Sequence, residues 1–277
     1  MARFWKKAVL AVAVSSATLA GCGTLQETTQ GNTVGVNRQQ RFSISSEEMN
    51  AQSQQAYSEV IAEAKSKRVL DTNAAMVSRV KRITNNLIAQ TPAIRPDARG
   101  WPWEVHVISM DEMNAWCMPY GKMVIYSGLI TKLKLTDAEI AQVMGHEMAH
   151  ALREHSREQA SRSQTTGIVS GILGAVGEAY GISNATKITG LAADVGFNLP
   201  FSRTHETEAD LLGMELAARA GYNPDAAASL WNKMQAAGSG GGLEFLSTHP
   251  DPANRQATLK ANAEKVRPLY NASAKKK

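Results

Sequence analysis

The sequence predicts an α+β fold that is mainly helical and contains one small antiparallel sheet. Several long segments repeat apolar residues at helical spacing, whereas only two short runs, residues 103–109 and 122–127, are β-branched and partly alternating. The chain has 277 residues, which is long enough for one well-filled hydrophobic core. We therefore expect a single domain over residues 46–270.

The N-terminus is typical of an exported protein. Basic residues precede an apolar run over residues 8–20, which is too short to span a bilayer but suits a signal peptide. The sequence Leu-Ala-Gly-Cys at 19–22 resembles a bacterial lipobox, which implies a leader over 1–21 and acylation of Cys22. Gly23 favours a lipoprotein of the outer membrane that faces the periplasm. An ordinary signal peptide in which Cys22 is incidental is the alternative.

The charge of the mature chain is close to balanced. The sequence holds 30 Lys and Arg against 25 Asp and Glu, but three cations lie in the predicted leader and three are the terminal residues 275–277. No basic patch with interleaved aromatic residues occurs, so nucleic-acid binding is not expected. With Cys22 acylated, Cys117 is the one remaining cysteine, which excludes an intramolecular disulfide.

Two polar stretches are expected to flank the domain. Residues 22–45 are rich in Gly, Thr, Gln and Asn and have little periodicity, which is typical of a flexible tether behind a lipid anchor. Residues 271–277 form a basic tail. Neither stretch is expected to carry chemistry.

Helices are predicted at the start of the domain. Ser45 and Glu48 form a capping-box pattern ahead of a helix that runs to about Leu70, and a second helix covers residues 76–88. His106 lies within the first β-branched run and has no partner at a fixed offset, so we expect it to be structural.

The central motif is His-Glu-Met-Ala-His at residues 146–150. It lies on a helix that is expected to start at a Thr and Glu capping box and to cover residues 136–163. Residues four apart share a helix face, so His146 and His150 can present two imidazoles to one metal ion, with Glu147 beside them. This pattern is typical of zinc hydrolases.

Two further features are expected near this motif. His155 follows His150 by five residues, which turns it away from the shared face, so we expect it to support the site or to face solvent rather than to bind a metal. Residues 167–197 are apolar and rich in glycine. They predict short helices that pack over the core or the cleft, with membrane contact as the alternative.

A catalytic zinc site needs a third protein ligand. The best candidate opens a helix that is predicted over residues 202–220, where Glu206 and Asp210 are four residues apart and share a face. Glu206 can bind the metal while Asp210 accepts a hydrogen bond from a ligand imidazole. Glu208, which points to the opposite side of the helix, is the alternative third ligand on spacing alone.

An ordered set of motifs extends over residues 75–265. It comprises His146 to His150, Arg203, Glu206 to Asp210, Gly221-Tyr222-Asn223-Pro224, Trp231-Asn232-Lys233-Met234, Thr248-His249-Pro250 and Arg255. Together these motifs resemble the zinc metalloproteases of peptidase family M48, and the ordered set is far more specific than its first member alone. The lipobox and the lack of predicted membrane spans make the chain most similar to the LoiP-type periplasmic lipoproteins of that family.

The resemblance implies a zincin-like (gluzincin) metalloprotease fold with one Zn²⁺ per chain. The implied ligands are His146, His150 and Glu206, and Asp210 matches the aspartate that supports a ligand histidine. The chain departs from the family pattern at Cys117, where a small or aliphatic residue is usual.

The resemblance also assigns residues outside the ligand set. Asn114, Ala115 and Trp116 match an edge strand to which a substrate backbone adds as a further strand. His249 matches a histidine that lies near the metal and either caps it or assists at the oxyanion. Arg255 follows His249 at the family spacing.

These assignments predict a zinc-dependent endopeptidase of the bacterial cell envelope. Glu147 is expected to act as general base on a metal-activated water, with His249 or Arg255 assisting at the oxyanion. Strand addition reads main chain, so the expected substrates are extended, misfolded or unassembled envelope proteins, as in protein quality control, with outer-membrane assembly partners. The alternatives are a latent protease or a holdase-like binding protein whose zinc is capped by His249, and a structural lipoprotein with a fortuitous motif.

Overall fold

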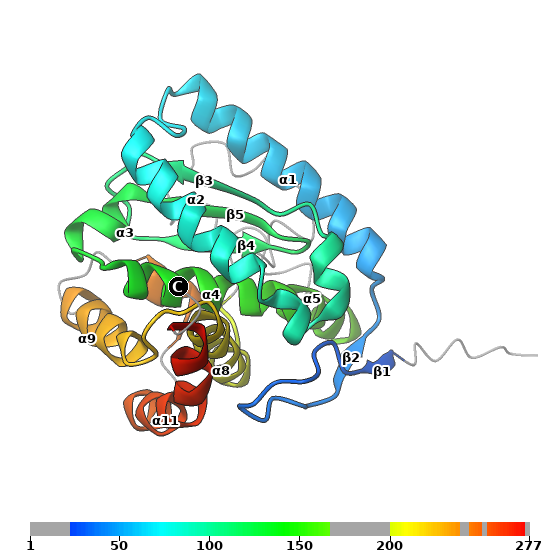
Figure 1. Cartoon of the computed structure of the whole chain (residues 1–277). Coiled ribbons are helices and arrows are strands. Elements are labelled where there is room, and N and C mark those ends of the chain that lie inside the picture. Colours follow the sequence, from blue (N-terminus) through cyan, green and yellow to red (C-terminus); the bar gives the residue numbers. More distant parts are fainter. Residues whose placement is uncertain (1–22, 167–199, 239–243, 251–253, 275–277) are drawn as a thin grey trace, which may run out of the picture.

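The computed structural model describes residues 23–166, 200–238, 244–250 and 254–274, and it confirms the mainly helical α+β class (Figure 1). The helices are α1 (Ser46–Ser66), α2 (Ala74–Ile88), α3 (Ser127–Lys132), α4 (Asp137–Leu152), α5 (His155–Thr166), α8 (Arg203–Arg219), α9 (Ala226–Gly238), α10 (Phe245–Thr248) and α11 (Arg255–Ala274). The strands are β1 (Thr24–Gln26), β2 (Gln40–Phe42), β3 (Glu104–Ile108), β4 (Ala115–Met118) and β5 (Lys122–Tyr126). The predicted leader, Cys22 and the glycine-rich residues 167–197 lie outside the described residues.

A three-stranded sheet in the order β3-β5-β4 lies at the centre of the fold (Figure 1). Strand β5 pairs in parallel with β3 and in antiparallel with β4. The predicted antiparallel pairing of residues 103–109 with 122–127 is therefore wrong. The physical reason is that β4 lies between them in the chain and joins β5 through a tight hairpin, in which Tyr120 and Gly121 adopt φ values of +67° and +84°. This extra reversal makes β3 and β5 run the same way.

Each face of the sheet is covered by helices. On one face, strand residues pack against α1, and this cluster includes Tyr57, Ile61, Trp116, Met118 and Val124. On the other face, alternate residues of the same strands join the main core with α2 and α4, among them Val105, Ala115, Met123 and Ile125. Because side chains alternate along a strand, this arrangement places the motif helix α4 directly against β4.

The motif helix α4 begins where the sequence predicts and ends earlier. Thr136 caps it through a full capping box with Glu139. The helix stops at Leu152, and Glu154 adopts a left-handed φ of +52° before α5 begins. The expected continuous helix over residues 136–163 is therefore wrong. Apolar spacing does not reveal this break, because its stabilising contacts are polar: the Glu154 carboxylate lies 2.8 Å from both Arg95 and Arg157.

The N-terminal segment, residues 23–44, is packed against the domain, so the prediction of a flexible tether over 22–45 is wrong for its described part. Its apolar side chains Val34, Val36, Phe42 and Ile44 are buried. Strands β1 and β2 pair as an antiparallel ribbon, and β2 contacts α5. The composition is misleading because much of the docking is polar, with Gln40 fully buried. At the other end, α11 continues to Ala274, past the predicted start of the basic tail at 271.

Helices α4 and α8 pack against each other (Figure 1). Gly145 and Gly213 face each other where the two helices cross. A Cβ atom built on Gly213 would lie 2.5 Å from the backbone nitrogen of His146, and one built on Gly145 would lie 2.7 Å from the Gly213 carbonyl oxygen. This close approach brings the histidines of α4 next to the acidic start of α8. Within the described ranges, none of the helices combines the length and the apolar character needed to cross a bilayer.

Candidate metal centre

Four side chains from three parts of the fold meet in a buried cluster. His146 and His150 come from α4, Glu206 comes from the first turn of α8, and His249 follows α10. Each is at most 3% exposed, and their potential ligand atoms all lie within 4.8 Å of one another. The three residues predicted as ligands are thus placed together, with His249 as a fourth member.

The shorter distances within the cluster are those of neighbouring ligands around a tetrahedral metal ion. His150 Nε2 lies 3.1 Å from His146 Nε2 and 3.4 Å from Glu206 Oε1. His249 Nδ1 lies 3.3 Å from His146 Nε2 and 3.1 Å from Glu206 Oε1. Ligands about 2.0–2.1 Å from a tetrahedral zinc ion are separated by roughly 3.3 Å. Three imidazole nitrogens and one carboxylate oxygen therefore suit a divalent ion, with His249 at the fourth corner.

Asp210 and Arg255 form hydrogen bonds to His146 and Glu206 of the cluster. Asp210 Oδ1 lies 3.0 Å from His146 Nδ1, so this carboxylate can orient the imidazole as expected. Arg255 donates to Asp210 Oδ2 at 2.7 Å and to Glu206 Oε2 at 3.1 Å. Its guanidinium carbon also lies 3.2 Å from the ring centroid of Trp231. This geometry favours a role for Arg255 in holding the two carboxylates over the expected role at an oxyanion.

Glu147 lies beside the cluster without belonging to it. Its Oε1 is 3.5 Å from His249 Nε2 and accepts no hydrogen bond from the described residues. Burial raises the pKa of Glu147, although the nearby imidazoles of His249 and His146 partly oppose this. For Glu206 burial acts in the same direction, but the imidazoles of His249 and His150 hold its pKa well below the usual range. Glu147 is thus suited to exchange a proton, whereas Glu206 is suited to stay ionised.

Strand β4, which is expected to pair with substrate, lies against Glu147. Asn114 precedes β4, which contains Ala115 and Trp116, and in the described part of the chain β4 pairs only with β5. The backbone of Cys117 lies close enough to the Glu147 carboxylate to lower its pKa, so β4 faces the motif helix at this residue. The Cys117 thiol is buried, and burial raises its pKa well above the usual range. This places Cys117 as a packing residue beside the site.

The segment that carries His249 also covers the start of this strand. Phe245 donates its backbone N–H to the Met113 carbonyl at 3.3 Å, and the Met113 N–H donates to the Glu244 carboxylate at 3.4 Å. Phe245 also stacks on the His249 ring, with centroids 4.2 Å apart. Residues 244–249 therefore link the edge strand to the cluster.

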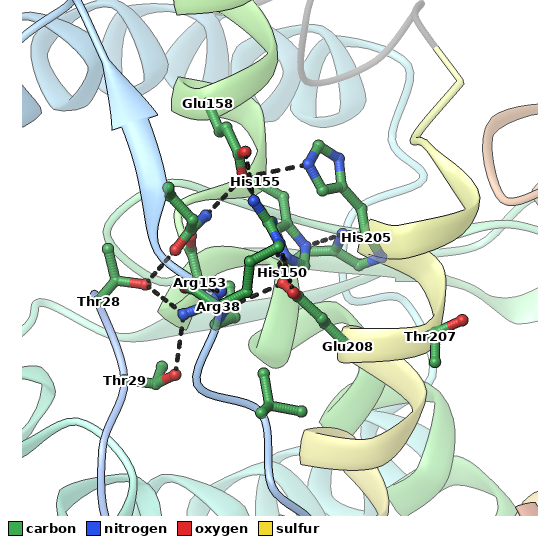
Figure 2. Close-up of polar contacts among 12 residues, drawn as sticks. Thr28, Thr29, Arg38, His150, Arg153, His155, Glu158, His205, Thr207 and Glu208 are labelled. Atoms are coloured by element: carbon green, nitrogen blue, oxygen red, sulfur yellow. Dashed lines mark hydrogen bonds and ion pairs between the residues drawn. The ribbon is translucent and has the colours of Figure 1, made fainter. Parts of the chain in front are cut away.

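A second polar network, which the sequence did not predict, adjoins His150 (Figure 2). Its members are Thr28, Thr29, Arg38, Gln40, Arg153, His155, Glu158, His205 and Glu208. Glu208, the alternative third ligand, belongs here: it binds Arg38 and His155 rather than the metal cluster. His155 is buried, which excludes its solvent-facing alternative. The signal in the sequence was the density of charge at 153–158, directly after the motif.

Comparison with known proteins agrees with this geometry. The model for "Peptidase family M48" matches residues 74–263. The mitochondrial metalloendopeptidase OMA1 of Schizosaccharomyces pombe is 31% identical over 225 residues, which cover 80% of this chain and 63% of the relative. OMA1 of Arabidopsis thaliana is 33% identical over 196 residues, covering 71% and 38%.

A bacterial relative is also similar to this chain. The beta-barrel assembly-enhancing protease of Escherichia coli is 29% identical over 177 residues, which cover 61% of this chain and 36% of the relative. The chain thus spans less than two thirds of each of these relatives. Since the family model covers well over half of the sequence and the site has the matching residues, the chain belongs to peptidase family M48.

Proposed function

We propose that this protein is a zinc-dependent endopeptidase of the bacterial cell envelope that is latent at rest and cleaves extended, misfolded or unassembled envelope proteins. One observation carries the proposal: the potential ligand atoms of His146, His150 and Glu206 lie 3.1–3.6 Å apart, and the Glu147 carboxylate lies 3.5 Å from His249, the fourth member of the cluster. A purely structural metal site has no need of that buried carboxylate.

Each side chain has a distinct part in peptide hydrolysis. A bound zinc ion would supply Lewis-acid chemistry, lowering the pKa of a water molecule and polarising the peptide carbonyl. Glu147 would accept the proton of the attacking water and deliver it to the leaving amine, which suits a carboxyl group whose pKa is raised by burial. Asp210 and Arg255 would keep His146 and Glu206 in place.

The substrate would bind as an added strand on β4. Strand β4 approaches Glu147 at the Cys117 backbone, so a peptide aligned on its unpaired edge would bring its main chain to the general base. Such pairing uses backbone hydrogen bonds and therefore selects extended segments more than particular side chains. This supports unfolded clients and weak sequence specificity.

His249 would keep the resting site closed. Its Nδ1 takes the fourth corner of the cluster, and residues 244–249 lie against the start of the edge strand. Four protein ligands are also the arrangement of structural zinc sites, so this observation equally favours the second candidate, a holdase-like protein that binds clients without cleaving them.

Replacing His249 by Ala separates the two candidates. If the competent state is a minor one, as for many two-state proteins, removing the cap should raise casein cleavage about tenfold or more. A fluorescent casein assay with zinc-loaded protein measures this gain. The double variant His249→Ala, Glu147→Gln is the control and should show none. A holdase would stay inactive in both, and an enzyme that is already open would lose activity or stay level.

The place in the cell rests on the lipobox and on the bacterial relative. The chain is similar to a protease whose name links it to β-barrel assembly, which supports outer-membrane assembly partners and a periplasmic site. If Cys22 carries the lipid anchor, Cys22→Ser should move the protein from the membrane fraction to the soluble fraction of fractionated cells. Retention of the Cys22→Ser variant on membranes would contradict lipid anchoring through this residue.

A further inference from the structure

The two histidines of the motif helix are supported in different ways. A histidine that binds a metal through one nitrogen is usually oriented by a hydrogen bond at the other. For His146 the partner is Asp210, 3.0 Å from Nδ1. For His150 the Nδ1 atom faces another imidazole, because His155 Nδ1 lies 3.0 Å away.

His155 connects His150 to a carboxylate. The other nitrogen of His155, Nε2, lies 3.0 Å from Glu208 Oε2. An ionised carboxylate only accepts hydrogen bonds, so a neutral His155 carries its proton on Nε2 and leaves Nδ1 as an acceptor. His150 then donates from its own Nδ1–H, which leaves the lone pair of His150 Nε2 pointing into the metal cluster. The opposite tautomer of His155 would place a proton on His150 Nε2 and block metal binding.

Arginines hold the Glu208 carboxylate in position. Arg153, which is fully buried, donates from Nε to Glu208 Oε2 at 3.1 Å. Arg38 donates from Nε to Glu208 Oε1 at 2.7 Å and from both terminal nitrogens to Glu158, at 2.7 and 2.8 Å. Figure 2 shows these side chains converging from α4, α5, α8 and the N-terminal segment.

Arg38 is anchored by the segment that bears it. Gln40, two residues on, donates to the Arg153 carbonyl and to the Glu158 carboxylate, both at 2.7 Å. The Arg38 carbonyl in turn accepts from Arg153 at 2.9 Å. The N-terminal segment is therefore bonded to the residues that surround His155.

We propose that His155 and Glu208 are positioning residues that fix the tautomer and orientation of His150, and that Arg38 of the N-terminal segment holds Glu208 for this purpose. The inference deepens the proposed function and rests on its metal site. It predicts that Arg38, which lies outside residues 74–263 matched by the family model, increases the affinity of the site for metal.

The test compares four variants of the full-length chain. His155→Leu removes the acceptor for His150, whereas His155→Asn keeps an oxygen acceptor close to the position of Nδ1. Arg38→Ala removes the support of Glu208, and Arg41→Ala is the matched control, because Arg41 is an exposed residue of β2. Zinc affinity is measured by competition with a chromogenic chelator.

We expect His155→Leu to weaken zinc binding by about 10- to 100-fold, the usual effect of losing such a partner. His155→Asn should recover most of that loss, Arg38→Ala should weaken binding by less than His155→Leu, and Arg41→Ala should match the wild type. In metal-free protein labelled with ¹⁵N-histidine, NMR should show His150 as the Nδ1–H tautomer in the wild type and as a mixture in His155→Leu.

Two results would overturn the proposal. One is wild-type zinc affinity and an unchanged His150 tautomer in a folded His155→Leu variant. The other is an equal loss in His155→Leu and His155→Asn together with an equal fall in Tm, which a merely structural role would give. If His155→Leu does not fold, Arg38→Ala against Arg41→Ala decides. Because neither readout uses proteolysis, a protein that binds zinc but cleaves no casein even as the His249→Ala variant would refute the proposed function and leave this inference standing.

Discussion

Replacing Glu147 by Gln is expected to reduce peptide hydrolysis about a thousandfold while leaving zinc binding intact, since general acid–base catalysis contributes roughly 10²- to 10⁴-fold. The amide has the size of the carboxyl group but cannot take a proton from water. Glu147 is not one of the clustered ligands, so metal content should be unchanged. Casein cleavage in the uncapped His249→Ala background, with zinc measured per chain, gives both quantities.

The matched control is Glu139→Gln on the same helix. Glu139 is buried at the start of α4, where it closes the capping box and pairs with Lys233 at 2.7 Å. Glutamine also serves in a capping box, so this variant should keep its activity. Full cleavage by Glu147→Gln, or cleavage that survives complete removal of zinc by a chelator, would contradict the assigned mechanism.

Replacing Gly213 by Ala is expected to lower both stability and metal affinity. The added methyl would lie 2.5 Å from the His146 nitrogen and 2.7 Å from the Gly145 carbonyl carbon. These are backbone atoms, so the clash can be relieved only by moving α4 away from α8. Overpacking of this kind costs about 1–3 kcal/mol, which corresponds to a fall in Tm of roughly 5 °C for a domain of this size.

The metal affinity of Gly213→Ala should fall together with its stability, because α4 supplies His146 and His150 whereas α8 supplies Glu206. We expect at least a tenfold loss, in line with the effect of displaced ligand support. Gly100→Ala is the control, since no described atom lies within 4 Å of a Cβ built there, and it should match the wild type. An unchanged Tm and zinc affinity in Gly213→Ala would mean that the crossing is looser than the structure shows.

The part of the site that follows helical spacing could be predicted from the sequence. His146 and His150 share a face because they are four apart, and the same rule paired Glu206 with Asp210. The family resemblance then preferred Glu206 to Glu208, and the structure places Glu206 in the cluster. These pairings depend only on local helix geometry, so they can be predicted without knowledge of the tertiary fold.

The rest depends on contacts that are remote in sequence. Strand direction in the sheet is set by how many times the chain reverses. The resemblance marks Asn114 to Trp116 as an edge strand, but it does not show that this strand reverses the chain between the two β-branched runs. The role of Arg38 depends on Glu208, 170 residues away. Low hydrophobicity predicted a flexible segment there, because composition does not show that polar side chains will meet partners in a buried network.

The packed N-terminal segment changes the geometry of anchoring. Thr24 already pairs with Phe42 in the β1–β2 ribbon. If Cys22 bears the lipid, only Gly23 separates it from the folded domain, a reach of roughly 7 Å. A linker this short would not let the domain move far from the membrane. Under that proposal the folded domain would lie close to the lipid headgroups.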